Sequence, residues 1–260
     1  MPQVFPPGPA LGLAAVLVLL GGLHRTVGLG ALGWVVGLAC GVGLAALLAR
    51  GMLRASRRTL LPADRVTLAR AVLVCGVAAL TADAVAGGEP PVGLLVALSS
   101  VALSLDAVDG RVARRTGTVS ELGARFDMET DAVLILVLSL HVSGDLGWWV
   151  LGIGSARYVF LLVGVASRRA PWLRGQVPPR RWRKLVAAYQ GVALTVATAH
   201  VLPPAGATAA VGAGLALLLV SFGTEVATLR LQSVRRSSTA PFRYAVPPVP
   251  LDGAVSRAVP

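Results

Sequence analysis

The stretch from Asp106 to Asp131 reads D-A-V-D-G-R-V-A-R-R-T-G-T-V-S-E-L-G-A-R-F-D-M-E-T-D, and it contains six of the twelve acidic residues of the chain. The segments on either side of it, residues 92–105 and 132–140, are almost entirely apolar. Carboxylates that adjoin apolar runs of this kind are costly in a membrane and are kept mainly where they have a function. The stretch therefore predicts apolar helices that carry a chemically active group of acids.

The spacing of four aspartates in this stretch predicts a metal site. Asp106 and Asp109 are three residues apart, and Asp127 and Asp131 are four residues apart. On helices, both intervals place the two side chains on one face, about one turn from each other. Four carboxylates that face a common point would repel one another, and a bound divalent cation removes that repulsion. A ligand set made only of oxygen suits Mg²⁺ or Mn²⁺ rather than Zn²⁺.

The other residues of the stretch suit a substrate that carries phosphate. Small residues would let two helices and a ligand approach closely, and these are Gly110, Ala113 and Gly123. Arginines that would bind phosphate surround the acids, and these are Arg111, Arg114, Arg115 and Arg125. Acids that only cap helix ends are the alternative, but such charges normally come singly and near a first turn. The local pattern therefore indicates metal-assisted chemistry on a phosphate.

The spacing also matches a known signature. Asp106-x2-Asp109-Gly110-x2-Ala113-Arg114-x8-Gly123-x3-Asp127-x3-Asp131 resembles the motif of the CDP-alcohol phosphatidyltransferase family at every fixed position. The resemblance covers roughly residues 61–231 and implies an all-α, polytopic membrane helix bundle with a six-helix core that forms a homodimer. It implies a phospholipid-biosynthetic enzyme that transfers a phosphatidyl group from a CDP-linked lipid, expected to be CDP-diacylglycerol, to an alcohol and releases CMP.

The resemblance also implies roles for individual residues. The metal ligands, for Mg²⁺ or Mn²⁺, would be Asp106, Asp109, Asp127 and Asp131. Asp131 would take the proton of the acceptor hydroxyl, with Asp127 as the other catalytic aspartate. The nucleotide neighbourhood would contain Gly110, Ala113, Arg114 and Gly123.

A second, shorter pattern precedes this motif. Asp64-x2-Thr67-x2-Arg70 resembles the first-helix pattern of the same family, in which asparagine commonly stands in place of Asp64. The resemblance implies that Thr67 and Arg70 help to bind the nucleotide. The alternative is a helix whose N-cap is Asp64 and whose arginine is interfacial.

The composition supports a membrane protein. Apolar residues make up 55% of the 260 residues and charged residues only 14%, which is typical of a polytopic membrane protein. The net charge of +12 comes almost entirely from arginine, since Lys184 is the only lysine. Nucleic acid is excluded as a partner because the arginines lie between apolar spans. When the spans are threaded alternately through the membrane, nearly all of the arginines fall on one side of it. We therefore expect a multi-pass integral cell membrane protein whose active site faces the cytoplasm.

The apolar runs predict two spans before the family core and six within it. The predicted spans are residues 10–23, 28–49, 61–85, 92–114, 121–142, 146–167, 185–201 and 205–231. The domain organisation expected from them is a membrane hairpin at 1–58, a catalytic domain at 59–232 and a disordered cytoplasmic tail at 233–260. A row of glycines, Gly33, Gly37 and Gly41, predicts close helix packing of the hairpin. The role of this hairpin stays open.

Three basic residues outside the motif are candidate acceptor-binding residues. Arg157 lies near the middle of an apolar span, where an unpaired charge is costly. It would either contact an anionic substrate or pair with a buried group such as Glu225. Arg183 and Lys184 end a basic loop that would either bind the phosphate of an acceptor or act only as a topology signal.

Other functions fit the sequence less well. A membrane prenyltransferase would need a second acidic motif far away in the chain, and a divalent-cation transporter would need acids near the bilayer midplane on several helices. A catalytically inactive family member is disfavoured by the complete motif. The acceptor stays open among glycerol 3-phosphate, an inositol phosphate, serine and a lipid alcohol, and the loop arginines favour a phosphorylated polyol.

Overall fold

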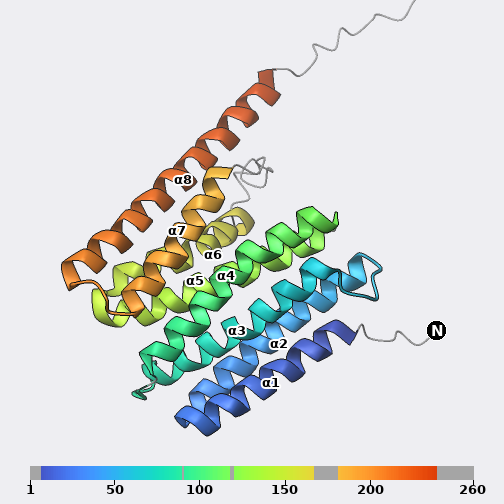
Figure 1. Cartoon of the computed structure of the whole chain (residues 1–260). Helices are drawn as coiled ribbons and strands as arrows, with labels where there is room; N and C mark the ends of the chain where they lie inside the picture. The colour runs from blue at the N-terminus through green and yellow to red at the C-terminus, as the bar shows by residue number, and fades with distance from the viewer. Residues whose placement is uncertain (1–6, 90, 118–119, 167–180, 239–260) are drawn as a thin grey trace, which may run out of the picture.

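The computed structural model describes residues 7–89, 91–117, 120–166 and 181–238, and these residues form α-helices, one 3-10 helix and short connections, with no strand among them (Figure 1). The elements are α1 (Pro7–Val27), α2 (Ala31–Arg54), α3 (Pro62–Val85), α4 (Val92–Thr116), α5 (Glu121–Leu146), η1 (Trp148–Val150), α6 (Leu151–Ala166), α7 (Arg181–Thr198) and α8 (Pro204–Ser238). The expected all-α bundle, with a hairpin followed by six core helices, is confirmed.

Several helices are built to cross a membrane. Within the described residues, five helical segments are long and apolar enough to span one, and these are Pro7–Val27, Ala31–Arg54, Pro62–Val85, Val92–Val112 and Pro204–Thr224. The outward faces carry large apolar side chains, such as Val18 on α1, Leu162 on α6 and Val220 on α8. In water such a surface would be unfavourable, whereas in a bilayer it contacts hydrocarbon. The protein is therefore a multi-pass membrane protein.

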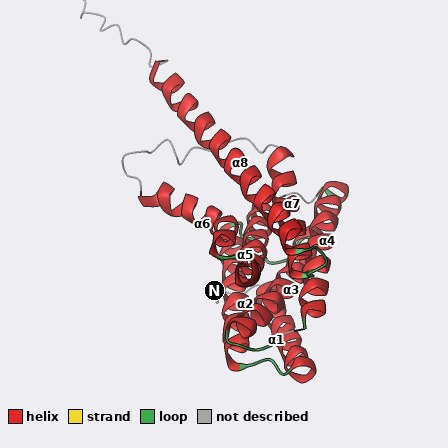
Figure 2. Cartoon of the chain, turned by 90° about the vertical axis from the view of Figure 1, so that its left-hand side faces the viewer, coloured by secondary structure: helices red, strands yellow, loops and turns green. Residues whose placement is uncertain are grey.

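Helix α3 is the central helix of the half of the bundle that carries the acids. It packs against α1, α2, α4 and α5, and Figure 2 shows the same arrangement from the side. Of its apolar span, 61% is buried inside the bundle, against 18–28% for the other four spans. A polar side chain on α3 is therefore shielded from lipid and must find its partners within the protein.

The N-terminal hairpin shares one hydrophobic core with the other helices. Leu20 of α1 and Leu48 of α2 are fully buried in the same cluster as the apolar side chains of α3. The predicted close packing of the glycine row is confirmed, because Gly33, Gly37 and Gly41 are all buried. At Gly37 an added Cβ would lie 2.9 Å from the Cβ of Ala79 on α3, so only glycine permits this approach.

Three boundaries differ from the sequence-based prediction. The turn expected at residues 143–145 is still helical, and the chain instead turns at Gly147, whose φ of +99° favours glycine. Helix α7 begins at Arg181, so residues 183 and 184, which the prediction places in a loop, lie in a first helical turn. Helix α8 continues to Ser238, so residues 233–238 of the expected tail are helical, and residues 239–260 lie outside the described residues.

Candidate active site

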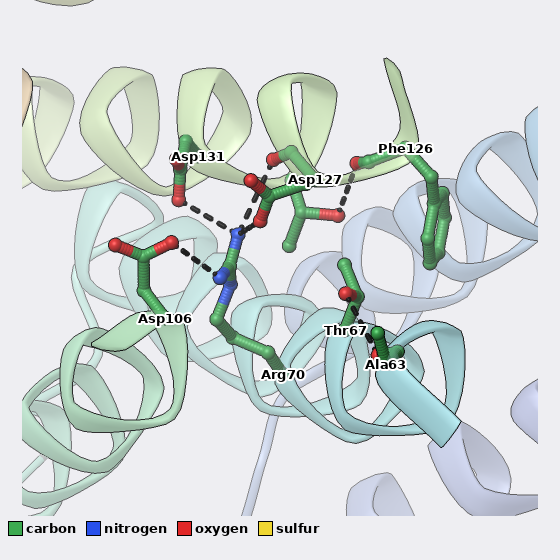
Figure 3. A network of polar contacts seen from close by, with 8 residues as sticks. Ala63, Thr67, Arg70, Asp106, Phe126, Asp127 and Asp131 are labelled. Carbon is green, nitrogen blue, oxygen red and sulfur yellow. Dashed lines mark hydrogen bonds and ion pairs between the residues drawn. The ribbon is translucent and has the colours of Figure 1, made fainter. Parts of the chain in front are cut away.

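Three of the four predicted metal ligands converge in space. Asp106 comes from α4, whereas Asp127 and Asp131 come from α5. One carboxylate oxygen from each lies within 4.8 Å of the other two (Figure 3). The side chains are 41%, 29% and 32% exposed, so a ligand can reach them. The fourth predicted ligand, Asp109, lies on α4 one turn beyond Asp106, but its side chain is outside the described residues.

The start of α5 fixes the position of two of these acids. The side chain of Ser120 is the N-cap, and its hydroxyl oxygen accepts a hydrogen bond of 3.0 Å from the backbone N–H of Gly123. From this start, Asp127 and Asp131 follow on one face of the helix, and both turn towards α3. The sequence motif therefore becomes a site because α4 and α5 both pack against α3.

Arg70 of α3 joins the three acids. Its Nη1 donates to Asp106 Oδ1 at 2.8 Å, and its Nη2 donates to Asp127 Oδ1 at 2.5 Å and to Asp131 Oδ1 at 2.9 Å. The same Nη2 lies 3.2 Å from the backbone oxygen of Asp127. The Arg70 side chain is fully buried (Figure 3). The resemblance implied that Arg70 helps to bind the nucleotide, with an interfacial arginine as the alternative, and no pattern in the sequence predicted its contacts with the aspartates.

A cleft of about 240 Å³ opens over these acids. Its lining combines the three aspartates with one basic side chain, small residues and apolar residues: Leu103, Asp106, Ala107, Gly110, Asp127, Asp131, Leu134, Ile135, Lys184, Ala187 and Ala188. Lys184 therefore shares the cleft with the aspartates, although the two parts of the sequence are more than fifty residues apart. The side chain of Arg183, the neighbouring candidate, is outside the described residues.

The predicted nucleotide residues have different environments. Gly110 lines the cleft. Thr67 is buried, and its hydroxyl donates to the backbone oxygen of Ala63 at 3.2 Å. At Gly123, an added Cβ would lie 2.6 Å from Asp64 Oδ1, so this glycine allows α5 to approach α3. The two remaining members of the set, Ala113 and Arg114, have side chains outside the described residues.

The alternative role considered for Asp64, as the N-cap of its helix, is wrong. The N-cap of α3 is Leu61, and Asp64 lies three positions further into the first turn. Its Oδ2 accepts a hydrogen bond of 3.2 Å from the backbone N–H of Leu61. The carboxylate thus stabilises the helix start from within the helix, and it is almost completely buried there.

Arg157 of α6 has a partner that the sequence did not identify. Its Nη2 donates to Glu129 Oε1 on α5, and the two side chains are 28% and 27% exposed. Glu129 lies between Asp127 and Asp131 in sequence, but a helix turns a residue at this spacing to another face. The side chain of Glu225, the partner considered from the sequence, is outside the described residues.

A lipid-facing helix bundle with a group of carboxylates in a cleft defines an integral membrane protein with a candidate metal centre. The model of the CDP-alcohol phosphatidyltransferase family matches residues 60–223, which is more than half of the chain. The chain therefore belongs to this family of transferases, which act in phospholipid synthesis, and the resemblance seen in the motif is confirmed.

Two curated relatives also match. Both are described as "Probable phosphatidylglycerophosphate synthase", from Mycobacterium tuberculosis strains CDC 1551 / Oshkosh and ATCC 25618 / H37Rv. Each is 32% identical to this chain over 145 residues, a region that covers 53% of this chain and 66% of the relative. The chain thus matches just under two thirds of the length of these relatives. No solved structure matches the chain.

Proposed function

We propose that the protein transfers a phosphatidyl group from CDP-diacylglycerol to a hydroxyl of a phosphorylated polyol and releases CMP. The observation that carries this proposal is the cleft in which Lys184 faces the same space as Asp106, Asp127 and Asp131. The acids suit a donor whose diphosphate is bound with a cation, and the lysine suits an acceptor that brings its own phosphate.

The three carboxylates fit a divalent cation. Their oxygens lie within 4.8 Å of one another, and oxygen ligands are those that Mg²⁺ and Mn²⁺ prefer. We propose Mg²⁺ or Mn²⁺ held by Asp106, Asp127 and Asp131, with Asp109 as a further ligand from the motif. When bound, the cation would neutralise charge on the diphosphate and on the departing CMP.

The proposed reaction is a single substitution at phosphorus. The acceptor hydroxyl oxygen forms a bond to the phosphorus that carries the diacylglycerol, and the bond from this phosphorus to the oxygen of CMP breaks. We propose that the carboxylate of Asp131 takes the hydroxyl proton. Asp127, one turn before it, helps to hold this carboxylate array in place, since both bind the same guanidinium. Positioning and electrostatic stabilisation supply most of the rate enhancement in phosphoryl transfer.

Glycerol 3-phosphate is the acceptor that we favour within the polyol class. The two relatives are described as synthases of phosphatidylglycerophosphate, a product that keeps the acceptor phosphate. A phosphate in the cleft would be within the reach of Lys184, and Arg183 adjoins it in the sequence. Serine carries no phosphate, so it would not use the positive charge of Lys184.

The remaining proposals concern the surroundings of the site. The α2–α3 connection and the end of α4 lie at the same end of the bundle, and both are rich in arginine (Figure 1). By the positive-inside rule we propose that this end faces the cytoplasm. We also propose a homodimer, a catalytic domain at residues 59–232 and a hairpin at residues 1–58 that stabilises α3.

An acceptor panel tests the proposed reaction. Purified protein in detergent with CDP-diacylglycerol and Mg²⁺ should release CMP with glycerol 3-phosphate and much less with serine or inositol. Asp131→Asn should abolish CMP release and leave the thermal unfolding temperature close to that of the wild type. Asp145→Asn is the matched control. Asp145 lies at the other end of α5 from the site, where it pairs with His200. Turnover with serine alone, or full activity of Asp131→Asn, would contradict the proposal.

A further inference from the structure

The guanidinium of Arg70 takes a position that a metal-site cation would compete for. Its two terminal nitrogens contact carboxylates from both acid-bearing helices, at 2.8 Å to Asp106 and at 2.5 Å and 2.9 Å to Asp127 and Asp131. These are the same three residues whose oxygens could hold a metal ion. The acids therefore already have a positive partner that is part of the chain (Figure 3).

Burial makes this contact obligatory rather than incidental. The Arg70 side chain is fully buried, and α3 is the most enclosed of the five candidate spans. A charge removed from water is tolerated only when it is paired, and Arg70 is paired with three carboxylates at once. A guanidinium stays protonated under all relevant conditions, so this positive charge is permanent.

The charges predict that Arg70 stabilises the group of aspartates when no cation is bound and opposes the binding of a cation. Three carboxylates and one guanidinium leave an excess of negative charge, so the site still attracts a divalent cation. In the metal-free protein, Arg70 offsets part of the repulsion between the aspartates and links α4 to α5 through α3. When a divalent cation is bound, the same guanidinium lies next to another positive charge and repels it.

We infer that Arg70 is a resident counter-cation of the metal site. It is a positioning residue that keeps Asp106, Asp127 and Asp131 together when no metal is bound, and it lowers the affinity of the site for divalent cations. The inference rests on the proposed function only in assuming that the three aspartates bind a divalent cation. It differs from the nucleotide contact expected of Arg70, because it assigns the guanidinium to the carboxylates.

Direct measurement of Mn²⁺ binding tests the inference without an activity assay. The amount of free Mn²⁺, followed by its electron paramagnetic resonance signal, gives a Kd for the full-length protein in detergent. Arg70→Gln should lower this Kd by about tenfold or more, because a unit charge a few ångströms from the ion is removed at low dielectric. Arg65→Gln is the matched control, because Arg65 is an exposed arginine of the same helix. Its Kd should equal that of the wild type.

Thermal unfolding provides the second arm. In excess EDTA, Arg70→Gln should unfold at a lower temperature than the wild type, and saturating Mn²⁺ should raise its unfolding temperature by more than it raises that of the wild type. Arg70→Lys keeps the charge but not the planar guanidinium that binds two carboxylates at once. Its unfolding temperature in EDTA should lie between those of Arg70→Gln and the wild type. If Arg70→Gln does not fold even with Mn²⁺, the Kd of Arg70→Met decides, because methionine removes the charge and suits a buried, apolar position: a lower Kd than that of the wild type supports the inference, and an equal or higher Kd overturns it.

The outcomes separate this inference from the proposed function. Binding of Mn²⁺ to the wild type with an equal or higher Kd in the neutral variants of Arg70 would overturn the counter-cation role and leave the metal site intact. Failure of the wild type to bind Mn²⁺ at all would overturn the metal site, and the inference with it.

Discussion

The ion pair between Arg157 on α6 and Glu129 on α5 allows a quantitative test of the packing around the site. Both side chains are about three-quarters buried, at 28% and 27% exposed. Breaking a fully buried pair by removing one partner costs about 3–5 kcal/mol, whereas an exposed pair contributes about 0–1 kcal/mol. Because this pair lies between the two limits, Arg157→Met should lower the free energy of unfolding by about 2 kcal/mol.

A double-mutant cycle isolates the pair. Arg157→Met, Glu129→Gln and the double variant would be unfolded in mixed micelles with increasing SDS, and helicity would be followed by circular dichroism. We expect a coupling energy of about 1–2 kcal/mol, so that the double variant is more stable than the sum of the single losses predicts. Strictly additive losses would refute an energetic role of the pair.

The same variants decide between the two roles considered for Arg157. If its function is to pair with Glu129, both single variants should keep the wild-type KM for the acceptor once they are folded. If Arg157 contacts the acceptor phosphate directly, Arg157→Met should raise this KM by about tenfold or more, while Glu129→Gln should not. The structure favours the first result, because Arg157 is held by Glu129 and is not among the residues that line the described cleft.

Three further predictions follow from the site. Gly123→Ala should destabilise the protein by about 1–3 kcal/mol, because the new methyl group would meet the buried Asp64 carboxylate, whereas Gly212→Ala on α8 meets open space and should be neutral or slightly stabilising in thermal unfolding. Removal of divalent cations with EDTA should abolish CMP release and Mg²⁺ should restore it, and undiminished activity in EDTA would exclude a metal role. Lys184→Gln should raise the KM for glycerol 3-phosphate by about fivefold, a modest factor because the side chain is exposed, and an unchanged KM would remove Lys184 from the acceptor site.

The sequence was sufficient for much of the site because its signals are local. The intervals between Asp106 and Asp109, and between Asp127 and Asp131, depend only on the period of a helix. The long apolar runs depend only on the thickness of a bilayer. Helix ends were less predictable, since residues 143–145 are Ser-Gly-Asp, a sequence typical of a turn, and α5 nevertheless continues through them. The actual end is at Gly147, where the backbone has a positive φ.

The partners of the charged residues could not be read from the sequence. Arg70 is separated from Asp106 by 36 residues and from Asp131 by 61, and Arg157 from Glu129 by 28. No local periodicity relates positions so far apart. Which arginine meets which acid depends on how α3, α4, α5 and α6 pack.

The amino-acid sequence by itself determined that this chain forms apolar membrane helices, that it carries the phosphatidyltransferase motif and that its aspartates share helix faces. These properties follow from composition and from the helical repeat. Only the tertiary structure decided that a buried arginine of α3 lies among the aspartates and that Lys184 lines the same cleft. The reason is physical: a charge inside a bilayer-embedded bundle has no water to solvate it, so its position is set by the partners that packing brings to it.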